Sequence, residues 1–359
     1  MYFNMTFILM LPRTNVIINS TMSQYAIDTT ALTDHELWTL LDRVRFCISR
    51  SRALELAQFS LTIEQSSVLY ILQNRGGSAT AREIEDITMR QHHSISSLIN
   101  RMIKMGLVKR GKSETGRGSL IKMTKEGEIL AKQATVFSLE MVFSVLTPRQ
   151  KRQLIQLLCR LLDKARDLLG ISYKPPFLQN LINTNALDTV KKMNRLRDTT
   201  PDHELWSLVD RTGFAISRLR ELELAQFGLT IEQSSILYII RHRNGLVTTK
   251  ELEDITMRQQ CSISTLLTRM AGMGLITKEK TGTGKRYGIR MTREGQAISR
   301  KATIVSLEMT FADLKDSEKQ QLAILLTTLL DAGRNLLGIS YRLPFLRDTA
   351  KRHSPVLSR

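Results

Sequence analysis

Short polar side chains cluster between residues 91 and 105, and again between residues 259 and 272. Amide, hydroxyl and imidazole groups donate and accept hydrogen bonds at base edges, and glutamine or asparagine can hold adenine with two hydrogen bonds. Neither segment contains an acidic residue, whereas an ordinary solvated helix face would more naturally combine glutamate with lysine. The pattern favours base reading in double-stranded DNA over a merely solvated face. The candidate base-reading residues are Gln91, His92, His93, Ser96, Ser97, Asn100, Gln259, Gln260, Cys261, Ser264, Thr265 and Thr268.

Basic side chains surround a glycine-rich stretch that follows each polar segment. Residues 101–125 contain eight basic residues and one acidic residue, and residues 269–293 contain seven and one. A thin basic hairpin beside a polar helix can enter a minor groove while the helix occupies the major groove; the alternative is a solvated loop. The candidate backbone and hairpin residues are Arg101, Lys109, Arg110, Lys112, Arg117, Lys122, Arg269, Lys278, Lys280, Lys285, Arg286 and Arg290.

The two segments belong to a long internal repeat. Asp34 to Trp38 (DHELW) returns as Asp202 to Trp206, and Leu168 to Tyr173 (LLGISY) returns as Leu336 to Tyr341, with an offset of 168 residues each time. Solenoid repeats are roughly 20–50 residues long, so this period indicates a duplicated domain. The expected organisation is an N-terminal tail that is disordered (1–33), a first domain (34–178), a linker (179–201), a second domain (202–346) and a basic C-terminal tail (347–359).

Other chemistry has little support. The His92-His93 pair corresponds to Gln260-Cys261, and the chain has no i, i+4 histidine pair and no Cys-x-x-Cys motif, so we expect neither a metal nor another cofactor. No Ser–His–Asp or Cys–His set is present in both copies, so we do not expect an enzyme. The chain has three cysteines, an odd number without duplicated positions, which favours a reducing cytoplasm over a disulfide framework.

Helical periodicity and capping signals place these residues on particular elements. Thr62 with Gln65, and Thr80 with Glu83, have the spacing of capping boxes. Apolar stripes that include Leu54 in the first helix, and Met105 in the polar segment, are expected to face the core. The pattern predicts helices over 34–57, 62–74, 80–87, 91–105, 124–145 and 148–169, with a two-stranded hairpin formed by 107–110 and 120–123.

The last predicted helix is unusually rich in leucine. Its apolar residues are Leu154, Leu157, Leu158, Leu161, Leu162, Leu168 and Leu169. Such a stripe favours helix–helix pairing between domains, with a core helix of its own domain as the alternative. Twofold pairing of duplicated domains would suit two half-sites on DNA.

The overall charge agrees with a polyanionic partner. The formal net charge is +18 at pH 7, which suits nucleic acid or an acidic membrane surface. No stretch has the roughly 20 apolar residues of a membrane span, so we expect no membrane association through such a span.

The order of elements resembles the MarR family of bacterial winged-helix transcription regulators. Ser94 to Arg110 is similar to that family's recognition helix and first wing strand, and Met123 to Gly127 (MTKEG) resembles the segment that leaves the wing. The resemblance implies dimers built from the first and last two helices, with recognition helix and wing on DNA. It also implies, by analogy, a small aromatic or phenolic effector between the dimer helices and the DNA-binding part.

Two features depart from the family pattern. The usual wing carries an Asp-x-Arg pair, whereas the first tip here offers Glu114 and Arg117, and the second offers Lys285-Arg286. The resemblance therefore assigns the wing arginine role to Arg117 and Arg286. The second departure is the fusion, because family members normally have one domain per chain.

We therefore expect a mainly α fold with small β-hairpin wings, organised as two tandem winged helix-turn-helix domains with long flanking dimerisation helices. The expected function is a cytoplasmic, sequence-specific regulator, a repressor, that binds an imperfect palindrome of double-stranded DNA with half-sites roughly 10 base pairs apart. The domains would pair as an intrachain pseudo-dimer, or across chains in a homodimer. The alternative is a protein-interaction module, an anti-regulator that binds another regulator through its leucine-rich helices.

Overall fold

The computed structural model describes residues 32–112, 119–134, 136–171, 201–243, 245–280, 287–302 and 304–339. The expected tails, apart from residues 32 and 33, and the expected linker, apart from residue 201, lie outside these ranges. Arg117, Lys285 and Arg286 at the wing tips also lie outside the described residues.

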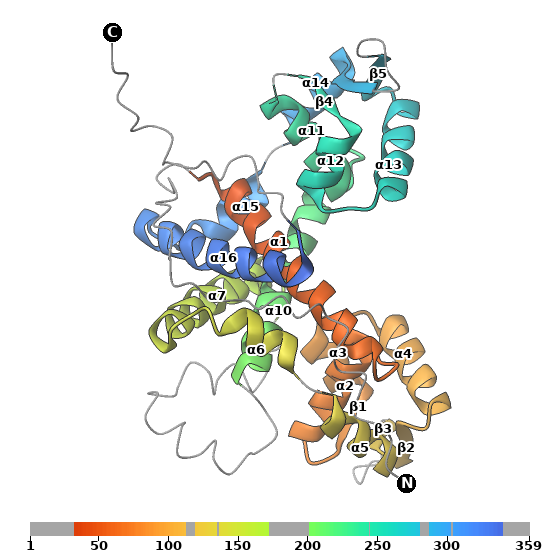
Figure 1. Cartoon of the computed structure of the whole chain (residues 1–359). Helices are drawn as coiled ribbons and strands as arrows, with labels where there is room; N and C mark the ends of the chain where they lie inside the picture. Colours follow the sequence, from red (N-terminus) through yellow and green to blue (C-terminus); the bar gives the residue numbers. More distant parts are fainter. Residues whose placement is uncertain are drawn as a thin grey trace. The chain divides into compact units, whose positions relative to one another are not determined.

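The two repeats fold into the same order of elements (Figure 1), which confirms the predicted fold class. The first repeat forms α1 (Asp34–Ala57), α2 (Ile63–Asn74), β1 (Ser78–Thr80), α3 (Ala81–Thr88), α4 (His92–Lys104), β2 (Val108–Lys112), β3 (Ser119–Met123), α5 (Lys125–Gln133), α6 (Phe137–Phe143) and α7 (Pro148–Leu168). The second forms α10 (Pro201–Ala225), α11 (Ile231–His242), β4 (Val247–Thr248), α12 (Thr249–Thr256), α13 (Gln260–Gly272), β5 (Ile276–Lys280), β6 (Tyr287–Met291), α14 (Arg293–Lys301), α15 (Val305–Phe311) and α16 (Asp316–Leu337).

Local sequence signals account for most helix starts. The side chains of Thr62 and Thr80 accept hydrogen bonds from the backbone N–H of Gln65 and Glu83, whose side chains accept in return from the backbone N–H of the two threonines. Both predicted capping boxes are therefore present. Gly106 follows α4 with a φ of 73°, the left-handed conformation that glycine adopts readily after a helix.

The wing is a three-stranded sheet, so the predicted two-stranded hairpin was incomplete. β1 pairs antiparallel with β3, which gives the order β1-β3-β2, and the second repeat has the order β4-β6-β5. Ala79 of β1 lies opposite Ile121 of β3, and both side chains are buried. Because a short hairpin is only marginally stable alone, the third strand ties it to the helices.

The predicted single helix over 124–145 was wrong, because the chain forms two helices there, α5 and α6. The carboxylate of Glu55 in α1 accepts hydrogen bonds from the backbone N–H of Phe137 at 2.8 Å and of Ser138 at 3.3 Å. These N–H groups belong to the first turn of α6, where the helix itself offers no acceptors. Glu223 does the same for Val305 and Ser306 in the second repeat.

Helices α2 to α5 and their sheet form a lobe (residues 63–133) with its own apolar core, and α11 to α14 form the second lobe (231–301). Two residues expected in the core lie at the surface: Leu54 is 55% exposed and Met105 is 43% exposed. Met105 instead receives a hydrogen bond at its sulfur from the side-chain amide of Gln65. Gly127 packs against the carbonyl oxygen of Leu107, where an added Cβ would not fit, so the glycine of the MTKEG segment permits α5 to approach the wing.

The remaining helices join the two repeats. Helix α1 packs against α16, and α10 packs against α7, so the first helix of each repeat contacts the last helix of the other (Figure 1). Lys151 pairs with Asp202 at 2.5 Å, and the corresponding Lys319 pairs with Asp34 at 2.6 Å. We refer to α1, α6, α7, α10, α15 and α16 together as the platform. The leucines of α7 that are buried are Leu154, Leu157, Leu158, Leu161 and Leu162.

Candidate nucleic-acid interface

Helix α4 divides cleanly into a buried side and an exposed side. Ile95, Leu98, Ile99 and Met102 are buried in the core of the first lobe. The other side carries the predicted base-reading residues. Gln91, His92, His93, Ser97 and Asn100 are exposed, and Ser96 is half-buried. Because residues three and four apart share a helix face, these side chains form one continuous polar surface.

Helix α13 has the same division. Ile263, Leu267 and Met270 are buried, whereas the predicted residues are all exposed: Gln259, Gln260, Cys261, Ser264, Thr265 and Thr268. The hydroxyl of Thr265 donates to the carbonyl oxygen of Cys261, and that of Thr268 donates to the carbonyl oxygen of Ser264, both at 2.9 Å. Since each hydroxyl has one proton, these two side chains offer only acceptor lone pairs to an outside partner.

A polar chain orients the start of α4. Nδ1 of His92 lies 2.6 Å from a carboxylate oxygen of Glu85 in α3, and Nε2 lies 3.4 Å from the hydroxyl of Ser96. A carboxylate only accepts, so Nδ1 carries the proton in this contact. In the second repeat Gln260 replaces His92, so the two lobes present different groups at equivalent positions.

Arg110 of β2 donates a hydrogen bond to the amide oxygen of Asn100 at 2.9 Å. The wing therefore fixes the amide of a candidate base-reading side chain, and the NH₂ group of that amide retains its two donors for a partner. The corresponding residues are Lys278 and Thr268. Sequence reasoning selected Arg110 and Asn100 separately, but it did not predict their contact.

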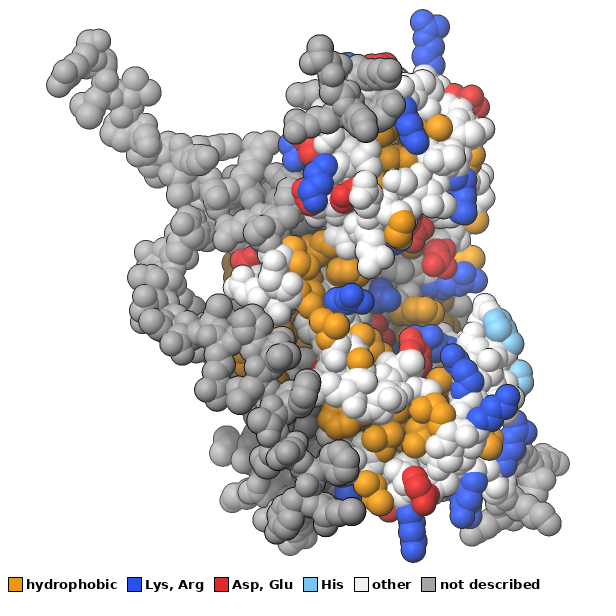
Figure 2. Space-filling model, turned by 45° about the vertical axis from the view of Figure 1, so that its right-hand side comes forward, with side chains coloured by type: hydrophobic (Ala, Val, Ile, Leu, Met, Phe, Trp, Pro, Cys, Tyr) orange, Lys and Arg blue, Asp and Glu red, His pale blue; other side chains and the backbone are white. Residues whose placement is uncertain are grey.

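Basic side chains border the polar faces of both helices. The exposed ones are Arg101, Lys109, Arg110 and Lys122 in the first lobe, and Arg269, Lys278 and Arg290 in the second. Lys112 and Lys280 end strands β2 and β5. Figure 2 shows Lys and Arg side chains gathered with His side chains over the first lobe, at the lower right of that view. The Nε atom of Arg290 donates to the carboxylate of Glu279 at 2.8 Å. The counterpart of Glu279 in the first lobe is Gly111, which has no acidic group.

These elements match a known family in both repeats. The model of the MarR family matches residues 59–117 and again residues 227–286. The two matched segments run from the start of the α2 and α11 regions into the wings. The chain carries two MarR-like domains in tandem. Helices α4 and α13 lie within the two matched segments.

Solved structures of MarR-type regulators resemble about one repeat of this chain. An organohalide-sensing transcriptional regulator, solved ligand-free, has 24% identity over 40% of this chain and 84% of its own, with a TM-score of 0.35. Its 2,4-dichlorophenol-bound form has 25% identity with the same coverage and TM-score. A mutant MarR from E. coli complexed with operator DNA has 18% identity over 40% of this chain and 97% of its own, with a TM-score of 0.31. No curated protein matches the sequence.

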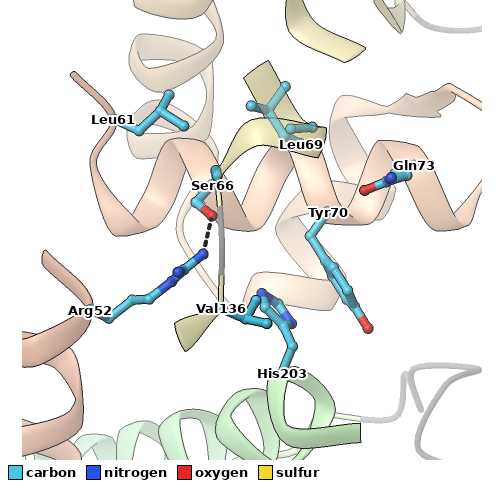
Figure 3. A pocket seen from close by; sticks show the side chains of 10 residues that line it. Arg52, Leu61, Ser66, Leu69, Tyr70, Gln73, Val136 and His203 are labelled. Carbon is cyan, nitrogen blue, oxygen red and sulfur yellow. Dashed lines mark hydrogen bonds between the residues drawn. The ribbon is translucent and has the colours of Figure 1, made fainter. Parts of the chain in front are cut away.

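Sequence reasoning missed two pockets between the MarR lobes and the platform. One is lined by Arg52, Ser66, Leu69, Tyr70, Val136 and His203, among others (Figure 3). The second is lined by the corresponding Arg220, Ser234, Leu237, Tyr238, Ile304 and His35. Each pocket receives one histidine from the other repeat, so no single repeat contains a whole pocket. A sequence signal exists in the recurrence of both histidines and both tyrosines, and of Arg52 as Arg220, at the offset of 168 residues.

The histidine that each pocket receives from the other repeat, His203 or His35, is neutral near pH 7. Burial, with the nearby charges of Arg220 and His242, lowers the pKa of His35 to about 3. Burial, with the charges of Arg52 and Arg211, lowers the pKa of His203 to about 3. Burial also raises the pKa of the Tyr238 phenol to about 12, so that group stays protonated.

Two of the three cysteines in the described part of the chain, Cys47 and Cys159, are buried. Burial raises the pKa of the Cys47 thiol to about 11 and that of Cys159 to about 12, so neither is a thiolate at neutral pH. Within the described ranges, no cluster of three His, Cys, Asp or Glu side chains could hold a metal ion. By length and composition, none of the described helices could cross a membrane singly, although the bent pair Lys125–Phe143 and Pro148–Leu168 meets the criteria together.

Proposed function

We propose that the chain is a sequence-specific regulator that binds double-stranded DNA through α4 and α13. The observation that carries this proposal is the polar, acid-free face that both helices expose beside cationic side chains. A helix of this width fits the major groove, where amide and hydroxyl groups distinguish all four base pairs. Arg101, Lys109 and Arg269 would neutralise phosphates and thereby set the register of the protein on the duplex.

The two lobes differ where they would contact bases. His92, His93 and Asn100 of the first lobe correspond to Gln260, Cys261 and Thr268 of the second, and the two threonine hydroxyls of α13 act only as acceptors. A pseudo-dimer with such lobes would bind an imperfect palindrome, with half-sites about 10 base pairs apart. We propose repression as the outcome of occupancy.

Footprinting on DNA selected from a random pool tests the proposal. The expected result is two protected arms of unequal sequence, with an affinity that falls linearly on a log–log plot against salt, at a slope near −0.9 for each phosphate neutralised. Ser97→Ala with Asn100→Ala should relax sequence preference in one arm only. The matched variant, Thr265→Ala with Thr268→Ala, should relax the other arm. Selection of no consensus sequence would rule out base reading.

The alternative of an anti-regulator finds less support. This function requires the leucine-rich final helices to hold another chain, yet all the leucines of α7 except Leu168 are buried within this chain, where α7 packs against α10 and α16. Arg117→Ala with Arg286→Ala separates the two functions, because DNA affinity should fall while affinity for a protein partner should not.

We also propose that the second pocket binds a small aromatic anion that regulates DNA binding. Its volume is about 290 Å³, against about 50 Å³ for the first, and a cavity of roughly 150 Å³ accommodates benzene. Arg241, His242 and Arg300 line it, whereas the corresponding residues of the first repeat are Gln73, Asn74 and Lys132. A ligand there would contact both α11 of the lobe and His35 of the platform.

Benzoate and its neutral analogue benzamide test this site in isothermal titration calorimetry. Benzoate should bind once per chain, and benzamide should bind at least tenfold more weakly. Arg241→Gln, which installs the residue of the first repeat, should abolish the difference, and Gln73→Arg serves as the matched control in the smaller pocket. Equal affinity of the unaltered protein for benzoate and benzamide would show that the pocket does not select for negative charge.

A further inference from the structure

The contacts between the repeats include several that are not symmetric. A perfectly duplicated interface would place the same residue pair at both equivalent positions. Some contacts follow that rule, as with Lys151–Asp202 and Lys319–Asp34. Three sets of contacts instead combine residues that differ between the repeats and that fit only in one combination.

The first set lies where α1 meets α10. Gly213 of α10 is the counterpart of Arg45 in α1, and the two positions face each other. A Cβ on Gly213 would lie 2.6 Å from Cδ of Arg45, so the arginine occupies space that the glycine leaves open. The Nε atom of Arg45 donates to Asp210 at 3.0 Å, and its guanidinium lies 3.7 Å from Asp42.

Pairing of two identical repeats would not allow the contact of Arg45 with Gly213 and the two aspartates. Asp42 and Asp210 are counterparts. Two copies of the first repeat would bring two arginines into the space that one fills. Two copies of the second repeat would leave two glycines and two facing aspartates without the arginine, and like charges in contact are unfavourable.

The second set lies where α1 meets α16. Gly333 of α16 packs on Cys47 of α1, and a Cβ on Gly333 would lie 2.8 Å from the Cys47 Cβ, a contact that side chains cannot adopt without backbone movement. At the equivalent place between α7 and α10, the corresponding residues are Ala165 and Ala215, both fully buried. Pairing of two first repeats would place the Cβ of Ala165 against the Cβ of Cys47, in the space that Gly333 leaves open.

The third set is electrostatic. Arg160 of α7 pairs with Glu318 at 2.5 Å, and Lys164 pairs with Asp313 at 3.5 Å. Their counterparts carry no charge: they are Thr328, Gln150, Ala332 and Val145. The cations therefore belong to the first repeat and the anions to the second. Since these side chains are partly exposed, the pairs contribute to the choice of partner more than to stability.

We infer that the platform is an interface selective for unlike repeats, so that each repeat fits the other repeat and rejects a second copy of itself. Steric fit at Arg45–Gly213 and Cys47–Gly333 supplies most of the selectivity, and the Arg160 and Lys164 pairs reinforce it. This selectivity of pairing does not depend on whether the lobes bind DNA.

A double-mutant cycle in the full chain tests the steric part. Gly333→Ala places the residue of the first repeat against Cys47 and should lower the Tm by roughly 2–8 °C through overpacking. Cys47→Gly alone should also lower the Tm, because it removes a buried side chain. In the double variant the Cβ of the new alanine takes the space that the Cβ of Cys47 has left, so the loss of Tm should be smaller than the sum of the two single losses.

A second cycle tests the contact between α1 and α10. Gly213→Arg should destabilise the chain, and addition of Arg45→Gly should restore its stability by reversing the pair between the two aspartates. Additive effects in both cycles, or a Gly333→Ala variant as stable as the unaltered chain, would overturn the inference.

Discussion

The imidazole of His203 stacks on the phenol ring of Tyr70, with ring centroids 3.7 Å apart and an interplanar angle of 25°. His203 lies in the first turn of the platform helix α10 of the second repeat, whereas Tyr70 lies on α2 in the first lobe. The same contact joins His35 to Tyr238 with centroids 4.0 Å apart. Each lobe is thus held directly by the other repeat, through a histidine that is neutral.

These two histidines predict a chain that loses stability in mild acid. Their pKa values are about 3 in the folded chain, against 6.5 for an exposed histidine. Between these values the unfolded chain binds more protons, so stability rises with pH through that window and levels off above about 6.5. At pH near 5 the loss should be about 2 kcal/mol for each histidine. Urea unfolding between pH about 5 and 7.5 measures it.

Phenylalanine substitutions separate the effect of histidine protonation on stability from the effect of ring stacking. His35→Phe with His203→Phe keeps an aromatic ring against each tyrosine and should flatten the dependence of unfolding free energy on pH. An equally steep dependence in this double variant would assign the acid sensitivity to other groups.

Removal of the buried carboxylate of Glu55 should destabilise the protein strongly. It accepts from the first turn of α6 and lies 2.7 Å from the Arg52 guanidinium, which is almost fully buried. Glu55→Ala leaves these donors without their acceptor, and loss of one partner of a buried pair typically costs about 3–5 kcal/mol. Denaturant unfolding measures the free energy of unfolding of Glu55→Ala and of the matched variant Glu223→Ala. Glu64→Ala removes a more exposed ion pair and should change stability by less than about 1 kcal/mol.

Substitution of Arg110 should separate sequence preference from general DNA affinity. Arg110→Lys keeps the charge but loses the planar group that holds Asn100. The ratio of specific to non-specific affinity should fall by roughly 5- to 100-fold, while non-specific affinity stays close to that of the unaltered protein. Lys109→Ala should instead weaken binding to every sequence alike. Fluorescence anisotropy with a selected site and a scrambled site distinguishes the two, and a Lys109-like result for Arg110→Lys would contradict the positioning role.

Neutralising Glu279 should strengthen DNA binding through the second lobe. Its carboxylate pairs with Arg290. The variant Glu279→Gln removes the negative charge, so the guanidinium of Arg290 becomes available to a DNA phosphate. Affinity should increase several-fold, and the log–log salt slope should steepen by about 0.9. Glu221→Gln changes the net charge equally but lies on the platform helix α10, next to Arg218. If both variants bind alike, the gain is a general effect of charge.

Local signals were sufficient for the parts of the fold that local interactions determine. The capping threonines Thr62 and Thr80, and the glycine after α4, each act within a few residues of themselves. The break between α5 and α6 depends on Glu55, more than 80 residues earlier in the chain, so helical periodicity alone predicted one long helix. Strand β1 has three residues, too few for an alternating pattern to be recognised.

The candidate interface was accessible to sequence reasoning because side-chain type and helical spacing define it. The pockets were not, since each combines a lobe with His35 or His203 of the other repeat. The difference between Arg45 and Gly213 is visible when the repeats are aligned. That the two positions face each other, however, depends on how α1 packs against α10.

The pairing of Arg45 with Gly213 has an evolutionary consequence. In a homodimer encoded by one short gene, every codon change appears in both halves at once. Here each codon is expressed once per assembled molecule, because the halves are distinct and complementary. Mutation of α13 can therefore be selected without disturbing α4, so the two exposed helix faces are free to diverge one at a time.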